Sequence, residues 1–151
     1  MVQSMPWRRA RHDVPADLPE GFVATEAPAL QATIRSAFVA GEGAAPMAVE
    51  LTFAPGAAGR VVVVWRNRNV GFVPREHADD LHRVLTQGQH VRLVAEGRLY
   101  HDGSWWRIWV GPDPVGPLPV PPAGYDELPP PAPTIFGFAF GASRPDPTAP
   151  G

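Results

Sequence analysis

The amino-acid sequence predicts an α+β fold, a small and mostly antiparallel β-barrel or curled sheet of about five strands with one or two helices. Residues 60 to 88 predict a strand, a tight turn, a second strand and a helix that begins after Pro74. Residues 47 to 53 alternate between apolar and polar side chains, as a half-buried strand does. A further pair of strands flanks Asp102-Gly103, which is a strong turn signal.

The first 40 residues contribute little to the predicted sheet. Residues 1 to 25 contain three prolines and no hydrophobic period, which predicts a flexible arm with a small basic spot at residues 7 to 12. Residues 28 to 40 predict a short amphipathic helix with Leu30, Ile34 and Phe38 on one face. This apolar stripe is typical of packing against the core.

The predicted first hairpin joins Val61–Trp65 to Val70–Val73 through Asn67 and Arg68, because asparagine tolerates the positive φ of a two-residue turn. This turn pairs Trp65 with Val70, Val64 with Gly71 and Val63 with Phe72. Both faces are apolar, so the two strands are expected to be central in the sheet. A glycine at position 71 indicates a close approach of backbone or a bend. The glycine-rich loop before this hairpin lacks the Lys, Ser and Thr of a phosphate-binding loop.

Residues 75 to 87 predict a helix that Gly88 ends. Carboxylates crowd its start, where the helix dipole favours negative charge. Its apolar face is expected to consist of Ala78, Leu81, Val84 and Leu85.

The predicted second hairpin comprises residues 91 to 100 and 104 to 111. A two-residue turn would place Tyr100 opposite Trp105 and Arg98 opposite Arg107. One face of this pair is apolar and is predicted to lie in the core. The opposite face carries Arg92, Glu96, Arg98, Tyr100, Trp105, Arg107 and Trp109.

Residues 112 to 151 form a predicted proline-rich tail, because they hold 13 of the 20 prolines. An apolar island at residues 135 to 141 could dock on the body, add a strand to the sheet or bind a partner. The predicted organisation is therefore a flexible arm at 1–25, a β-barrel domain with an N-terminal helix at 26–111, and the tail at 112–151.

Composition and motifs favour a non-catalytic protein without cofactor or metal. The chain has no cysteine, no apolar run of transmembrane length and no signal-peptide pattern, so we expect a cytoplasmic protein without membrane contact. The net charge of −2 argues against a wholly basic nucleic-acid binder. No zinc-protease motif, nucleophile elbow or phosphate loop occurs.

The outward face of the second hairpin is the surface with binding character. Tyr100, Trp105 and Trp109 can stack on nucleic-acid bases. Arg92, Arg98 and Arg107 can contact phosphates. Arg66 and Arg68 lie at the neighbouring turn and complete the predicted nucleic-acid-binding set. Exposed tryptophan equally marks protein interfaces. The face could also be covered by the N-terminal arm, the tail or a second subunit.

Residues 60 to 85 carry a pattern, Val61–Val64 followed by Val70-Gly71-Phe72-Val73-Pro74 and a helix, that resembles part of the HIRAN domain. The resemblance covers about residues 45 to 111. It implies a small β-barrel related to OB-type folds, and some members bind single-stranded DNA ends. The family's Asn/Asp-rich segment, which holds part of the DNA contact, is replaced here by APGAAGR at residues 54 to 60.

Two functions from different classes remain open at this point. The first is a HIRAN-like module for single-stranded nucleic acid. The second is a protein-interaction module that uses the tail and the Trp/Arg face. Loss of binding at high salt would mark the first, because phosphate contacts release counterions.

Overall fold

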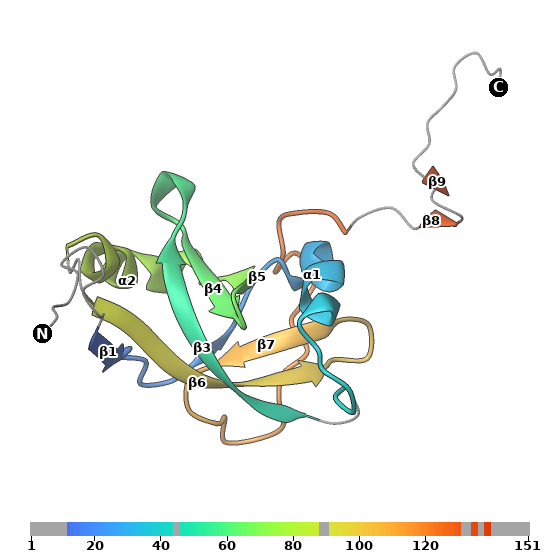
Figure 1. The fold of residues 1–151 in the computed structure, drawn as a ribbon, viewed down its shortest axis with the longest axis horizontal. Coiled ribbons are helices and arrows are strands. Elements are labelled where there is room, and N and C mark those ends of the chain that lie inside the picture. The colour runs from blue at the N-terminus through green and yellow to red at the C-terminus, as the bar shows by residue number, and fades with distance from the viewer. Residues whose placement is uncertain (1–11, 44–45, 88–90, 131–133, 136–137, 140–151) are drawn as a thin grey trace, which may run out of the picture.

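A curled sheet of seven strands dominates the described part of the chain (Figure 1). The fold comes from a computed structural model, which describes residues 12–43, 46–87, 91–130, 134–135 and 138–139. Along the sheet the strand order is β2-β7-β6-β3-β4-β5, and β1 pairs with β6 in parallel. The strands are β1 (His12–Pro15), β2 (Phe22–Val23), β3 (Met47–Pro55), β4 (Val61–Trp65), β5 (Arg68–Phe72), β6 (Val91–His101) and β7 (Trp106–Val110). The predicted α+β class with a curled, mostly antiparallel sheet is confirmed.

The two ends of the strand order are joined by one bridge. Residue Thr25 follows β2, and its N–H donates to the Phe72 carbonyl of β5 at 2.8 Å. The Phe72 N–H donates back to the Thr25 carbonyl at 3.1 Å. The sheet therefore curls around one apolar core instead of lying open.

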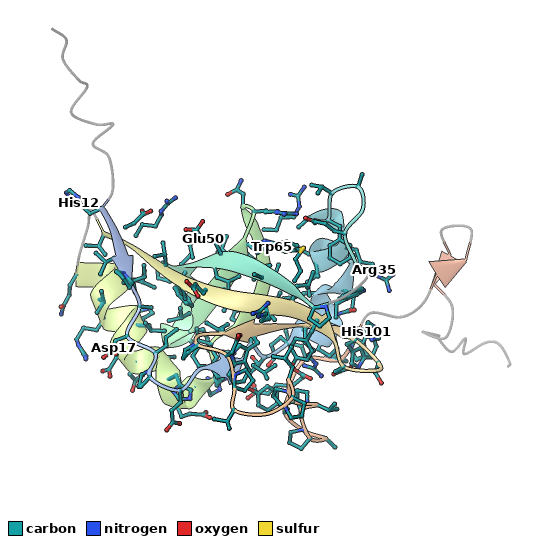
Figure 2. All side chains as sticks on the ribbon, turned by 90° about the horizontal axis from the view of Figure 1, so that it is seen from below. His12, Asp17, Arg35, Glu50, Trp65 and His101 are labelled. Atoms are coloured by element: carbon teal, nitrogen blue, oxygen red, sulfur yellow. The ribbon has the colours of Figure 1, made fainter. Side chains whose placement is uncertain are left out.

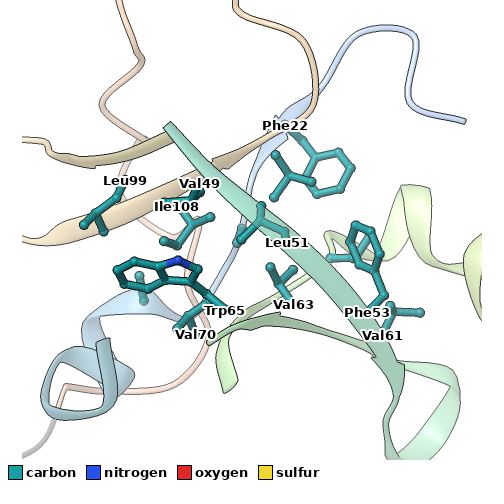
Figure 3. Packing of buried hydrophobic residues seen from close by; sticks show 14 of the residues in the cluster. Phe22, Val49, Leu51, Phe53, Val61, Val63, Trp65, Val70, Leu99 and Ile108 are labelled. Carbon is teal, nitrogen blue, oxygen red and sulfur yellow. The ribbon is translucent and has the colours of Figure 1, made fainter. Parts of the chain in front are cut away.

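The core fills the concave side of this sheet (Figure 3). Val49, Leu51 and Phe53 of β3 are buried, which confirms the alternation predicted for this strand. Trp65 and Ile108 pack into the same cluster from β4 and β7. Burial of these side chains supplies most of the driving force for folding.

The first hairpin turns at Arg66 and Asn67, one residue earlier than predicted. Both residues have positive φ, 51° and 65°, and such a turn matches the right-handed twist of the strands. Trp65 therefore pairs with Arg68, and the predicted register is wrong. A register shift after Val63 then places Gly71 opposite Val63.

Gly71 lies where two segments of backbone meet. A Cβ added there would lie 2.7 Å from the Ala24 side chain, so the close approach predicted for this glycine is present. The two strands of the first hairpin were both expected to be central in the sheet. β4 lies between β3 and β5 as expected, whereas β5 ends the strand order.

The second hairpin has a longer loop than the two-residue turn predicted. The Asp102 carboxylate accepts the N–H groups of Ser104 and Trp105, each at 2.8 Å, and so holds residues 102 to 105 as the loop. Arg107 consequently faces Tyr100, and the predicted pairing of Arg98 with Arg107 is wrong. The shift is two residues, so each side chain stays on its predicted face.

The helices agree with prediction in place and differ in length. α2 (Arg75–Gln87) has the predicted bounds. Residues 28 to 40 instead form a 3-10 turn, Ala27–Leu30, followed by the short α1 (Gln31–Ser36). The Gln31 side chain ties this element to β7, donating to the Trp106 carbonyl at 2.9 Å.

The predicted arms need correction within the described residues. Residues 12 to 25, expected in a flexible arm, contain β1 and β2 and are hydrogen-bonded to β6 and β7. Residues 112 to 128, expected in an extended tail, contact the body, as described below. β8 (Thr134–Ile135) and β9 (Phe138–Ala139) pair with each other around the start of the apolar island. Residues 1 to 11, and most of the island, lie outside the described residues.

Candidate binding surfaces

Residues 112 to 128 cover the outward face of the second hairpin. Beneath them Tyr100, Arg107 and Trp109 retain only 3%, 4% and 7% of their accessible surface. The Trp109 indole N–H donates to the Pro112 carbonyl at 2.7 Å. The Tyr100 hydroxyl donates to the Pro119 carbonyl at 2.7 Å. Among the described residues it is the tail that covers this face, and we call residues 112 to 128 the covering segment.

Arg107 is a buried cation held between two carboxylates. Its Nε lies 2.8 Å from Oδ2 of Asp102, and its Nη2 lies 3.0 Å from Oδ2 of Asp126. Burial by itself raises the pKa of the Asp102 carboxyl. Hydrogen bonds from the Trp105 N–H, the Arg107 guanidinium and the Ser104 N–H outweigh this effect and keep the pKa of Asp102 below its usual value. Burial also raises the pKa of Tyr100 above its normal range. A residue predicted to meet phosphate is thus neutralised inside the fold.

Glu26 fastens the covering segment at a second point. It is buried and has a left-handed backbone conformation, with φ of 70°. Its N–H donates to the Asp126 carboxylate at 2.7 Å. In return its carboxylate accepts the N–H groups of Glu127, at 2.9 Å, and Leu128, at 2.7 Å. Detaching the segment would remove Asp126 from Arg107, which would keep only Asp102, and would remove the N–H donors of Glu127 and Leu128 from the buried Glu26 carboxylate. Loss of one partner from a buried ion pair costs about 3–5 kcal/mol.

The other predicted arginines are dispersed over the surface. Arg92 pairs with Asp13 at 2.8 Å and Arg98 with Asp113 at 3.0 Å. Arg68 is exposed in the β4–β5 hairpin, and Trp105 is half-buried in the β6–β7 loop. The structure therefore buries Tyr100, Arg107 and Trp109 together, and it places the less buried Arg98 directly opposite Trp109.

Arg66, also in the predicted set, is tied to its own surroundings at the first turn. Its guanidinium donates to both carboxylate oxygens of Glu42, at 2.7 and 2.8 Å, and lies over the Trp65 ring at 4.5 Å. Hydrogen bonds from Arg66 and from the Val39 N–H lower the pKa of Glu42 to about 2. The Glu42 carboxylate therefore remains ionised at neutral pH. Its negative charge neutralises the positive charge of Arg66 that would otherwise attract a phosphate.

A groove between residues 14–22 and α2 is a surface that the sequence did not reveal. Its cavity has a volume of about 730 Å³. Val14, Leu18 and Phe22 contribute apolar surface on one side. Val84 was expected on the buried face of α2, but it is 40% exposed and lines the groove with Leu81.

Carboxylates form the rim of this groove. The acidic lining residues are Asp17, Glu20, Glu76, Asp79 and Asp80. No arginine lies among the described residues that line it. Asp80 pairs with Arg83 on the exposed side of α2, and the remaining four carboxylates carry their charge into the groove region. Sequence reasoning assigned the helix acids to the dipole and placed Asp17 and Glu20 in an arm, so their convergence was missed.

Comparison with known proteins gives no relative for this chain. No family model, curated protein or solved structure matches it. The HIRAN resemblance is therefore neither supported nor contradicted and stays a prediction. Within the described residues, no helix is long and apolar enough to span a membrane, and no cluster of three potential metal-ligating residues occurs.

The Asp102 ion pair should make stability fall in acid. The pKa of Asp102 is lower in the folded chain, so its contribution is present above the unfolded pKa of about 3.9 and is lost as pH falls through the folded value. We expect the urea midpoint to drop as the pH is lowered below about 4. Asp102→Asn should flatten this pH dependence, whereas Asp79→Asn, which leaves the Arg107 cluster intact, should preserve it. Equal slopes in the two variants would contradict the assignment.

Proposed function

We propose that the protein is a non-catalytic protein-interaction module that binds a basic peptide in the groove between residues 14–22 and α2. The observation that carries the proposal is the combination of an apolar floor with a carboxylate rim. The partner that suits such a groove is an extended or helical segment with apolar anchors and arginine or lysine beside them.

Exposure of apolar side chains supports a docking role for this groove. Six large hydrophobic residues are exposed in the described part of the chain, and Val14 and Val84 are two of them. Both lie in the groove, at 38% and 40% exposure. A partner that covered both would bury apolar surface worth about 25 cal/mol per Å².

Electrostatics favour a peptide over nucleic acid. Six of the nine described arginines form ion pairs with carboxylates of the same chain, so the described part of the chain keeps little free positive charge to replace phosphate counterions. On the outer face of the sheet, Glu50 of β3 lies directly opposite Glu96 of β6. The groove itself is acidic and would repel a phosphate backbone.

The test is fluorescence-anisotropy titration with a fluorescein-labelled synthetic peptide of alternating arginine and leucine containing one tryptophan. We expect binding to the full chain and a loss of affinity of about 2- to 30-fold in Glu76→Gln/Asp79→Asn, because each exposed pair contributes about 0.2–1 kcal/mol. The matched control is Glu50→Gln/Glu96→Gln, which removes the same charge from a different face. Equal affinity losses in the two double variants, or no binding at all, would overturn the proposal.

Single-stranded nucleic-acid binding, which the HIRAN resemblance implies, is the second candidate. The observation that favours it is the exposure of Arg68 in the same hairpin as Arg66, which stacks on Trp65. A labelled oligothymidylate in the same titration tests it at low and physiological salt. Salt-sensitive binding that Arg66→Ala/Arg68→Ala weakens would place nucleic acid ahead of the peptide.

A further inference from the structure

We propose that residues 1 to 11 of this chain are an intramolecular ligand of the acidic groove, which an external basic peptide must displace. The inference rests on the proposed function of the groove. It adds the identity of a first occupant and a form of regulation, since binding of a partner would require release of this segment.

The chemistry of residues 1 to 11 complements that of the groove. The sequence MVQSMPWRRAR contains three arginines and no carboxylate, and Met5, Pro6 and Trp7 lie directly before the first arginine pair. Arginine guanidinium groups pair well with the carboxylates of the rim. Tryptophan and methionine supply apolar anchors for the floor. Residues 1 to 11 therefore match the groove in charge and in apolar character.

The chain enters the sheet beside the groove. His12 begins β1 and pairs with Val91, the first residue of β6. Val91 lies only a few residues after Gln87, where α2 ends. Figure 2 shows His12 and Asp17 at the α2 end of the molecule, and Val14 of the same strand lines the groove. A segment that precedes His12 can therefore run back along α2 past Val84.

Chain length permits this path. Eleven extended residues reach about 36 Å. The thirteen residues of α2 span about 20 Å at 1.5 Å each. A few residues ending at Arg11 suffice to reverse the direction of the chain, and the residues that precede them can follow α2.

Tethering makes even a weak contact effective. A short flexible link gives a local concentration on the order of 1 mM. If the free segment bound with a Kd of about 0.1 mM, the tethered one would occupy the groove about nine-tenths of the time and weaken an external peptide about tenfold. At protein concentrations well below 1 mM the tether also favours the same chain over a second copy.

Other apolar segments of the described chain are less suited to this groove. The covering segment is fastened over the second hairpin by Arg107 and Glu26. It carries carboxylates at Asp113, Asp126 and Glu127, which the rim would repel.

The first experiment compares nitrogen–proton correlation spectra of the full chain and the full-length variant Arg8→Gln/Arg9→Gln/Arg11→Gln. We expect amide shift changes at residues 14–22 and 76–84, and the same peaks should move in the native chain as sodium chloride is raised from about 20 to 500 mM. Changes confined to residues 1 to 13 would overturn the inference. Shifts that vary with protein concentration would assign the contact to a second copy and also overturn it.

The second experiment separates this inference from the function on which it rests. The arginine–leucine peptide is titrated into both full-length proteins. An affinity about tenfold higher for the triple variant supports the intramolecular ligand. Equal affinities, with the Glu76→Gln/Asp79→Asn effect retained, would refute the ligand and leave the groove as a peptide site. Binding to neither protein would refute both.

Discussion

Replacing Arg107 by methionine should lower the free energy of unfolding by about 3–5 kcal/mol, the usual consequence of removing one partner from a buried ion pair. Arg107 is 4% exposed and is hydrogen-bonded to both Asp102 and Asp126. Without the guanidinium, two largely buried carboxylates lose their counter-charge. Urea unfolding followed by tryptophan fluorescence at pH 7 measures the effect.

The matched control is Arg83→Met, which breaks the exposed pair with Asp80 and should change stability by less than about 0.5 kcal/mol. A second variant separates charge from packing. Adding Asp102→Asn and Asp126→Asn to Arg107→Met should recover part of the loss, because no uncompensated charge then remains. A single-variant effect no larger than that of Arg83→Met would show that the covering segment is not held by this cluster.

Strand positions and faces in this fold follow from local patterns that the sequence displays. The alternation in β3, the apolar composition of β4 and the acidic first turn of α2 each depend on side chains near in sequence. The two registers depend on turn geometry. Asp102 accepts two N–H groups of its own loop and thereby lengthens it, and nothing in the dipeptide Asp102-Gly103 distinguishes this loop from a two-residue turn.

The candidate site was harder to predict because its elements are distant in sequence. Tyr100 and Trp109 show strand periodicity whether they face solvent or a covering segment. Both are buried by the covering segment, which is held in part by the contact of Glu26 with Asp126. Glu26 and Asp126 are 100 residues apart and meet only in the folded chain. A carboxylate at position 126 within a proline-rich stretch gave no local signal of an arginine partner.

The groove illustrates the same limit. Asp79 is explained well enough by the dipole of α2, and Asp17 by a solvated arm. Their shared rim exists because β1 pairs in parallel with β6, which brings residues 14–22 beside the helix. The two paired segments are about 80 residues apart, and the hydrophobic periodicity of neither segment indicates that they pair in parallel.

Trp109→Ala should cost about 3–5 kcal/mol in unfolding free energy, as for other buried tryptophans. The Trp109 ring is 7% exposed, and its N–H donates to Pro112. A Cβ added to Gly21 would lie 2.7 Å from the ring, which shows how closely that segment packs against it. Truncation would leave a cavity between the hairpin and the covering segment and would remove the hydrogen bond to Pro112.

This substitution also distinguishes a structural tryptophan from one that stacks on bases. Trp105→Ala, in the half-buried loop position, is the matched control and should cost about 1 kcal/mol or less. A base-stacking residue would show the reverse behaviour, with little loss of stability and a loss of about 1–3 kcal/mol in oligothymidylate binding. Unfolding of both variants in urea, read beside the anisotropy titration, decides between the two roles. If Trp109→Ala were as stable as Trp105→Ala, the covering segment would contribute little to the fold, and the aromatic face beneath it would become available to a ligand.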